Sequence, residues 1–168
     1  GLVGLMGPLE PSHNLKLAVT QRGKEELELT RLSVGEKKLT VLIHPGCGAD
    51  GTPREWPIEN YAVLCHWLIK NHRVQIVLTS GPEEMWKTHH LNRLLKGAAK
   101  DLGGKVSWEG LIAVIDRADL VISGNTGVMH VAAALHKNQI ALHGPTNPVI
   151  WGPLNSKAKV IQSTCAQC

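Results

Sequence analysis

The sequence predicts an α/β fold, with a parallel sheet covered by helices on both faces. Apolar runs of strand length alternate with segments of helical periodicity along most of the 168 residues. The expected strands are continuous apolar runs rather than alternating ones, which is typical of parallel strands buried on both faces. Glycine or proline follows most of these runs, so turns are expected at the strand ends. The length fits one domain of ordinary size.

The first elements follow a lead-in that contains many glycines and prolines. Residues 1–14 are expected to form this irregular lead-in or an interdomain linker, and residues 15–168 the domain itself. Residues 15–19 are a candidate short strand, and residues 20–33 a modest helix. Residues 39–45 form the first strong strand candidate, because this apolar run is rich in β-branched residues and ends at Pro-Gly.

The later elements begin with a helix at Pro57, after which apolar residues recur at helical spacing. The remaining expected elements are a strand at 73–81, a long polar helix from Pro82 to about Lys100, a helix at 109–118, a strand at 119–123, a helix at 128–135, and strands at 139–144 and 158–162. Strands and helices thus alternate throughout this part of the chain.

Composition restricts the class of partner. Hydrophobic residues make up 43% and charged residues 19%, as in soluble globular proteins, and no apolar run is long enough to span a membrane. The net charge, 18 − 14 = +4, is scattered, which suits an anionic small ligand or an acidic membrane surface better than duplex DNA. With no Phe, one Tyr and five Trp, a base-stacking surface is not expected either, so we expect no nucleic-acid partner.

Cysteine and histidine do not indicate a metal centre. Of the four cysteines only Cys165 and Cys168 form a C-x-x-C, and no second pair stands at zinc-binding spacing. Reduced thiols in a cytoplasmic protein are expected, with a metal or redox role for this pair as the alternative. The nine histidines are dispersed, so we expect no metal site.

One candidate ligand site is the segment S-G-N-T-G-V-M-H, which runs from a strand through a glycine turn into a helix. In parallel sheets ligands bind outside the carboxyl ends of the strands, and a helix N-terminus there attracts anions. Thr126 adds a hydroxyl donor, Gly127 allows close approach of a phosphate, and His130 follows one helical turn later. In the alternative interpretation Asn125 or Thr126 merely caps the helix and His130 packs on its neighbours.

A second candidate is the turn H-P-G-C-G after the first strong strand, followed in the same loop by Arg54. An ordinary glycine turn with a solvated arginine is the alternative. Glu83 could accept hydrogen bonds from ribose hydroxyls, or it could simply be a first-turn glutamate that is stabilised by the helix dipole. The dinucleotide G-x-G-x-x-G, the P-loop and the nucleophile G-x-S-x-G are all absent from the sequence.

Short motifs along the chain gain specificity from their combination and order. They are P-G-C, R-E-W-P, S-G-P-E-E, S-W-E-G-L, S-G-N-T-G-V-M-H-V-A-A-A-L, H-G-P-T-N-P and C-A-Q-C. Together they resemble the C-terminal half of glycosyltransferase family 9, the ADP-heptose:lipopolysaccharide heptosyltransferases. The most specific part is T-G-x-x-H-x-x-A-A followed by G-P-T-x-P, and the resemblance runs from about residue 15 to the end.

The resemblance implies the GT-B architecture, in which two Rossmann-like domains enclose the active site. This chain would be the C-terminal, nucleotide-sugar-binding domain. The catalytic base, an aspartate, would lie in the N-terminal domain, so no catalytic residue is expected in this chain and the isolated chain should not be active. The family uses no D-x-D metal motif, and none occurs here. We therefore expect ADP-heptose or a related nucleotide sugar as donor substrate, and no cofactor.

The resemblance also assigns donor-binding positions. Gly46 and Cys47 match the phosphate-loop positions, where other members often carry hydroxyl residues. Arg54 matches a basic residue near the donor phosphates, where it would neutralise charge on the departing ADP. Glu83 matches the ribose-binding glutamate, and Val106 matches a position that packs against adenine.

The second turn contains the remaining assigned positions, Asn125, Thr126, Gly127 and His130, which match the phosphate- and sugar-binding turn. Family members usually carry aspartate where this chain has Asn125. Asparagine gives up the charge but keeps one acceptor and gains a donor. This departure concerns the sugar specificity rather than the fold.

The resemblance further implies a lipid-linked oligosaccharide acceptor, bound through the N-terminal domain. It implies a cytoplasmic location, with peripheral contact at the cytoplasmic face of the inner membrane as a further expectation. Two alternatives stay open: another GT-B nucleotide-sugar enzyme, such as an epimerase or a transferase with a different donor, and a non-catalytic nucleotide-binding module.

Overall fold

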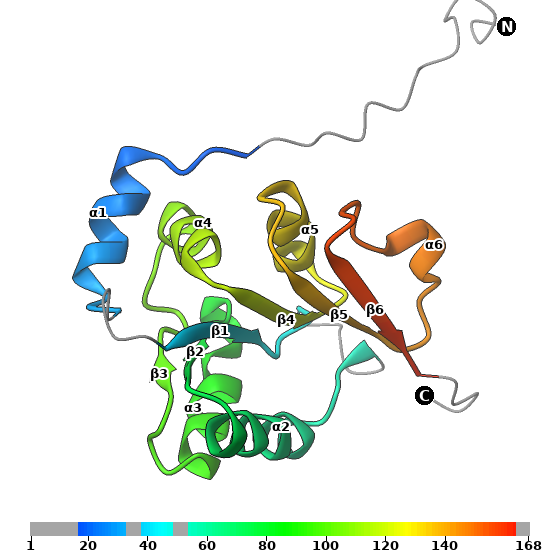
Figure 1. Ribbon diagram of the computed structural model, residues 1–168, viewed down its shortest axis with the longest axis horizontal. Helices are drawn as coiled ribbons and strands as arrows, with labels where there is room; N and C mark the ends of the chain where they lie inside the picture. Colours follow the sequence, from blue (N-terminus) through cyan, green and yellow to red (C-terminus); the bar gives the residue numbers. More distant parts are fainter. Residues whose placement is uncertain (1–16, 33–37, 49–53, 164–168) are drawn as a thin grey trace, which may run out of the picture.

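The computed structural model describes residues 17–32, 38–48 and 54–163. Its centre is a six-stranded sheet in the order β3-β2-β1-β4-β5-β6, and all neighbouring strands are parallel (Figure 1). This is the strand order of a Rossmann-like fold, so the predicted fold class is confirmed. The strands are β1 (Leu39–His44), β2 (Val74–Leu78), β3 (Lys100–Asp101), β4 (Leu120–Gly124), β5 (Gln139–His143) and β6 (Ala158–Gln162).

Helices cover both faces of this sheet (Figure 1). They are α1 (Gln21–Leu29), α2 (Ile58–Asn71), α3 (Met85–Leu94), α4 (Trp108–Arg117), α5 (Gly127–Ala134) and the short α6 (Pro148–Trp151), with a 3₁₀ turn at Pro82–Glu84. One layer contains α1, α4 and α5, and the opposite layer contains α2 and α3. Glycines let α1 and α4 approach closely: a Cβ on Gly23 would stand 2.5 Å from the Glu109 carbonyl oxygen.

Two apolar clusters, one on each face of the sheet, form the core. Along β1, Leu42 packs in the cluster under α4 and α5, whereas Val41 and Ile43 pack in the cluster under α2 and α3. The same alternation places Val121 and Ile122 of β4 on opposite faces. Because both faces are buried, successive residues of these strands are all apolar, which is the pattern that the sequence shows.

The strand expected at 15–19 is wrong for the part that the structure describes. Residues 17–19 have no strand pairing, while residues 15 and 16 lie outside the described residues. Thr20 is instead the N-cap of α1, and its side chain accepts a hydrogen bond from the Gly23 amide. Val19, just before this cap, packs against the core under α4 and does not pair with a strand.

The long polar helix expected from Pro82 to Lys100 ends earlier, at Leu94. Lys96 and Gly97 adopt positive φ angles of 54° and 77°, and the Gly97 amide donates to the Asn92 carbonyl 2.9 Å away. This is a left-handed helix end, for which glycine is the favoured residue. Lys100 and Asp101 then form β3, a strand that the sequence did not indicate, and pair with Val77 and Leu78 of β2.

The other expected elements are confirmed within a few residues. The helix that follows Pro57, the helices near 109 and 128, and the strands in the segments 39–45, 73–81, 119–123, 139–144 and 158–162 are all present. Only α6 among the described helices had no counterpart in the prediction. The strand order reverses between β1 and β4, because the chain leaves β1 toward β2 and returns to β4. A crevice outside the carboxyl ends of β1 and β4 is where sheets of this type bind ligands.

Candidate functional site

The two glycine turns that the sequence singled out meet at the switch between β1 and β4. β1 pairs with β4 up to His44 and Ser123, so the turns that follow leave the sheet side by side. They touch: a Cβ on Gly124 would stand 2.6 Å from the Cys47 sulfur. Glycine at 124 therefore lets the two turns pack against each other at the carboxyl edge of the sheet.

The turn after β4 leads directly into α5, with Thr126 at the N-cap. The Thr126 side chain makes no capping hydrogen bond, and the Asn125 amide instead donates to the Thr146 hydroxyl, 2.9 Å away. The capping alternative therefore does not account for these two side chains. Gly127 is exposed, and a Cβ built on it would meet nothing within 4 Å. The start of α5 is thus open, with amide hydrogens available to an anion.

A polar chain links this turn to the end of β5. The Thr146 hydroxyl lies 3.2 Å from Nδ1 of the buried His143. Burial lowers the pKa of His143, and the nearby His130 lowers it further. The hydrogen bond with the Thr146 backbone raises this pKa by less, so the neutral imidazole is favoured. His130 itself is exposed on the first turn of α5.

Several buried polar atoms at this edge have no hydrogen-bond partner in the described part of the chain. They are the hydroxyls of Ser80 and Ser123 and Nε2 of His143. Each follows or ends a strand at the carboxyl edge. Both amide atoms of the buried Gln139, at the amino end of β5, are also without a partner, so such atoms occur at both edges. Buried polar groups are normally paired, so those at the carboxyl edge are available to water or a polar ligand.

The turn after β1 is held by an acidic side chain. Oε1 of Glu84 accepts the Cys47 amide at 3.2 Å, so this N–H is not free in the structure. Burial raises the pKa of the Cys47 thiol to about 11. Cys47 is therefore a neutral packing residue rather than a nucleophile.

A buried cation completes this side of the site. Lys87, only 4% exposed, donates to Glu55 and, at 2.6 Å, to Glu84. Burial raises the pKa of Glu84, but the hydrogen bond and charge of Lys87 and the amides of Gly48 and Cys47 lower it more. Burial also lowers the pKa of Lys87, and the bonds to both carboxylates outweigh that effect. Both partners are thus held charged.

His44, the last residue of β1, lies behind this cluster. It is 5% exposed, and its Nδ1 lies 3.1 Å from the Thr79 hydroxyl. Burial is the main reason why the pKa of His44 is lowered to about 4. The charge of Glu84 raises this pKa, and the charge of Lys87 lowers it, each by less than burial does. His44 is therefore a neutral structural histidine near pH 7.

The other predicted residues are less central. Arg54 is half-buried and lines a groove of about 520 Å³ together with His143 and Gly144. Glu83 is exposed in the 3₁₀ turn, and it is the neighbouring Glu84 that reaches the turn at 46–48. Val106 is half-buried in a separate cavity of about 340 Å³ beside α1 and β3. Their assigned ligand contacts stay predictions.

Lys87 was missed from the sequence, and no role was assigned to Glu84, His143 or Thr146, although these three stand at strand ends or in segments that follow strands. The helical spacing could have indicated Lys87 as a buried residue. It stands four residues before Leu91 and eight before Leu95, on the buried face of α3. A lysine at an apolar position of a helix is expected to have buried partners. Thr146 stands in the G-P-T-N-P motif, but its contact with Asn125 across 21 residues has no local signal.

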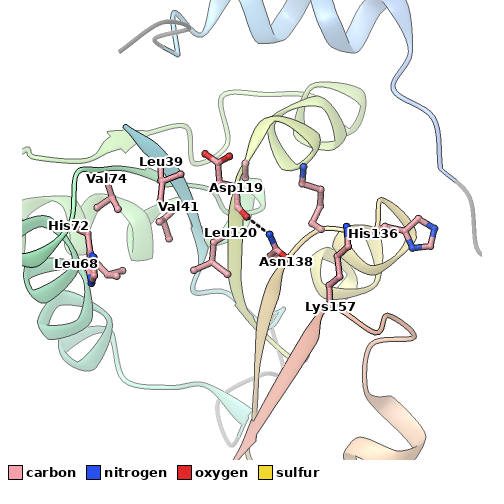
Figure 2. A pocket seen from close by; sticks show the side chains of 12 residues that line it. Leu39, Val41, Leu68, His72, Val74, Asp119, Leu120, His136, Asn138 and Lys157 are labelled. Carbon is pink, nitrogen blue, oxygen red and sulfur yellow. Dashed lines mark hydrogen bonds between the residues drawn. The ribbon is translucent and has the colours of Figure 1, made fainter. Parts of the chain in front are cut away.

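Another cavity lies elsewhere, at the amino ends of the strands. Its volume is about 570 Å³, and Leu39, Val41 and Leu120 line its apolar wall (Figure 2). Asn138 and Lys157 stand on the side of β5 and β6, and the Asn138 amide donates to the Asp119 carbonyl (Figure 2). None of the predicted donor-binding residues lines this cavity.

Two further observations concern the described ranges 17–32, 38–48 and 54–163. Within them no three metal-binding side chains stand close enough together to hold an ion. Their helices are also too short or too polar to cross a bilayer.

Comparison with known proteins identifies relatives of one kind. The family model of glycosyltransferase family 9 (heptosyltransferase) matches residues 6–168. The chain is 29% identical over 144 residues to lipopolysaccharide heptosyltransferase 2 of Salmonella typhimurium, covering 83% of this chain and 41% of the relative. The chain thus spans about two fifths of the length of that relative.

Solved structures agree with this comparison. The structure of Escherichia coli ADP-heptose LPS heptosyltransferase II matches 87% of this chain and 44% of its own, with a TM-score of 0.74 and 28% identity. E. coli heptosyltransferase WaaC with ADP matches 80% of this chain and 41% of its own, with a TM-score of 0.64 and 28% identity. The order of the sheet, the paired glycine turns and these matches lead to one conclusion: the chain belongs to glycosyltransferase family 9, the heptosyltransferases.

Proposed function

We propose that this chain is the donor-binding part of a glycosyltransferase that transfers heptose from ADP-heptose to a lipopolysaccharide core acceptor. The donor diphosphate would lie at the carboxyl ends of β1 and β4, between the turn at 46–48 and the start of α5. The observation that carries this proposal is the uncapped N-terminus of α5, open at Gly127 and packed against the other turn through Gly124. Amides at a helix start favour a phosphate.

Three groups would act on the donor. The α5 amides and the Thr126 hydroxyl would bind the diphosphate, and Arg54 would offset the negative charge that grows on the departing ADP. Asn125, fixed by Thr146, would address the sugar hydroxyls. The adenosine would extend toward Glu83 and Val106. The proposal requires no metal ion, because amides and a guanidinium supply the positive potential.

The catalytic base and the acceptor site belong, in this proposal, to a second domain of the complete enzyme. The relatives are more than twice as long as their matched part, which supports this division. The acceptor would be a lipid-linked oligosaccharide, reached at the cytoplasmic face of the inner membrane by peripheral contact. The 168-residue chain is therefore expected to bind donor and to transfer no sugar above background.

Calorimetric titration of the chain with ADP, UDP and GDP tests the proposal. Preferential binding of ADP is expected, and the E. coli relative solved with ADP supports that choice. A clear preference for UDP would contradict the ADP-heptose assignment and favour another nucleotide-sugar enzyme. Asn125, where the family usually carries aspartate, favours a second candidate, a non-catalytic nucleotide-binding module. ADP binding by a full-length protein that transfers no heptose would support that candidate.

A further inference from the structure

We propose that Lys87 is a positioning residue for donor binding. It connects Cys47, through Glu84, with Glu55 at the other end of the loop, and it offsets the negative charge of the Glu84 carboxylate beside the turn at 46–48. This inference rests on the proposed function. Lys87 lies in the first turn of α3, in the connection that follows β2, and not in either of the two turns after β1 and β4. No direct contact between Lys87 and the donor is proposed.

The contacts define what Lys87 joins. Its ammonium donates both to Glu55, just before α2, and to Glu84, in the 3₁₀ turn after β2. Glu84 in turn accepts the Cys47 amide at 3.2 Å. Through these bonds one cation connects the beginning of the loop, at Cys47, with its far end, at Glu55. Arg54 is adjacent to Glu55, so the same bonds restrain the backbone that carries the proposed phosphate-neutralising guanidinium.

The fit of Glu84 under the turn is close. A Cβ on Gly46 would stand 2.3 Å from Oε2 of Glu84, so glycine at 46 leaves room for the carboxylate. The carboxylate and the glycine therefore specify one arrangement of the turn. Lys87 keeps the carboxylate there, because its Nζ lies 2.6 Å from Oε1 of Glu84.

The charge balance explains why a cation is needed at this point. Two carboxylates, with side chains 12% and 23% exposed, would otherwise stand beside a turn that is proposed to face a diphosphate. Lys87, with a side chain 5% exposed, reduces the net charge of the three groups from −2 to −1. Without it, repulsion between the carboxylates and the phosphates would act in a partly desolvated place, where screening by salt is weak.

Lys87→Met and Lys87→Arg separate positioning from simple support of the fold. Lys87→Met removes the charge and is expected to weaken ADP binding about tenfold or more, while adenosine binding changes about threefold or less. Lys87→Arg keeps a cation able to contact both carboxylates and is expected to restore most of the ADP affinity. The exposed α2 residue Lys70 provides the control, since Lys70→Met should leave both affinities unchanged. Calorimetry with ADP and with adenosine measures the split.

A second measurement does not depend on any ligand. Amide hydrogen exchange at Cys47 is expected to be faster in Lys87→Met than in the unaltered chain, because Glu84 would no longer be held against that amide. If Lys87→Met does not fold, Lys87→Gln replaces it, since glutamine can still donate to a carboxylate without carrying charge.

Each outcome bears on one proposal. Parallel losses of ADP and adenosine affinity, or unchanged exchange at Cys47, would overturn the positioning role of Lys87. If the unaltered chain binds neither ADP nor adenosine, the proposed function fails, and the exchange rate at Cys47 still decides what Lys87 does.

Discussion

Three polar side chains at the carboxyl edge of the sheet are buried, whereas three that line a cavity at the amino edge are exposed. His44, Lys87 and Asn125 at the carboxyl edge are each less than 9% exposed. At the amino edge His136, Asn138 and Lys157 are exposed around the cavity of about 570 Å³. Burying polar groups costs free energy unless they are hydrogen-bonded, so the bonds of His44, Lys87 and Asn125 hold these side chains in fixed positions.

This difference shows that the volume of a cavity alone does not identify the ligand-binding site. The amino-edge cavity has a volume of about 570 Å³, and polar groups beside it bond to backbone, as Lys137 does with the Asp116 carbonyl at 2.6 Å. The carboxyl edge has unpartnered buried hydroxyls, an open helix start and two turns in contact. The four predictions below concern the carboxyl edge, and the first two include a control residue at the amino edge.

The largest expected effect concerns the pH dependence of stability at His44. Its pKa is about 4 in the folded chain against 6.5 ordinarily, because burial penalises the imidazolium. Above pH 6.5 both states are neutral, so this contribution is complete. As the pH falls from 6.5 to about 4, the unfolded chain takes up a proton that the folded chain refuses, and about 3 kcal/mol of stability is lost.

Urea unfolding between pH 7 and about pH 4 measures this loss. His44→Asn should show a smaller decline across that window than the unaltered chain. The exposed His136 is the amino-edge control: it has a φ of 52°, which asparagine tolerates, so His136→Asn should leave the decline unchanged. Equal declines in all three proteins would mean that burial at the carboxyl edge does not control this titration.

The next effect concerns the two cations that stand at opposite edges. Arg54→Ala should weaken ADP binding by about 1.5–3 kcal/mol, the scale of hydrogen bonds to a charged group, and should barely affect adenosine. Lys157→Ala, at the amino edge, should change neither affinity. If ADP and adenosine lost affinity equally in Arg54→Ala, the arginine would support the loop rather than the phosphates.

A smaller effect is expected at Gly127, the first residue of α5. Alanine meets no atom within 4 Å there and is a better helix former, so Gly127→Ala should stabilise the fold by about 0.5–1 kcal/mol. The same methyl group would stand where the phosphate approaches, and ADP should bind about tenfold more weakly. Thermal unfolding and calorimetry on one preparation give both numbers. Increased stability with undiminished ADP affinity would place the phosphates away from α5.

The smallest effect is expected for Asn125→Asp. Thr146 can reverse its hydroxyl and donate to the new carboxylate, so the fold should be retained. The added charge beside the diphosphate should weaken ADP binding by less than about 1 kcal/mol, and more at low salt than at high salt. Identical affinities at two ionic strengths would show that position 125 does not sense the phosphates. In a complete enzyme the same substitution should change kcat or sugar preference more than nucleotide affinity.

The sequence predicted those parts of the fold that repeat a local pattern. The strand at 39–44 and the helix after Pro57 follow from apolar runs and helical spacing. β3 could not be found in this way, because Lys100 and Asp101 are polar and become a strand only by pairing with β2. Apolar residues near Val19 resembled a strand, yet they lead into the cap of α1.

The site was predictable to the same extent. Strand ends followed by glycine placed the turns at Gly46 and Gly127 at one edge, since parallel strands share their carboxyl side. The hydrogen bonds between the turns were not predictable. Those from Cys47 to Glu84 and from Asn125 to Thr146 join residues 37 and 21 positions apart. Such contacts depend on the packing of whole elements and not on any local preference.

The proposed function requires that an adenine nucleoside diphosphate binds across the turns after β1 and β4. Titrating ADP into the uniformly ¹⁵N-labelled chain and following each backbone amide by NMR tests it most directly. We expect the amide signals of Cys47, Gly127 and Val128 to shift with a single saturation curve, while those of Asn138 and Lys157 stay unchanged. Shifts that gather around Asn138 and Lys157, with the two turns unaffected, would place the nucleotide in the amino-edge cavity and contradict it.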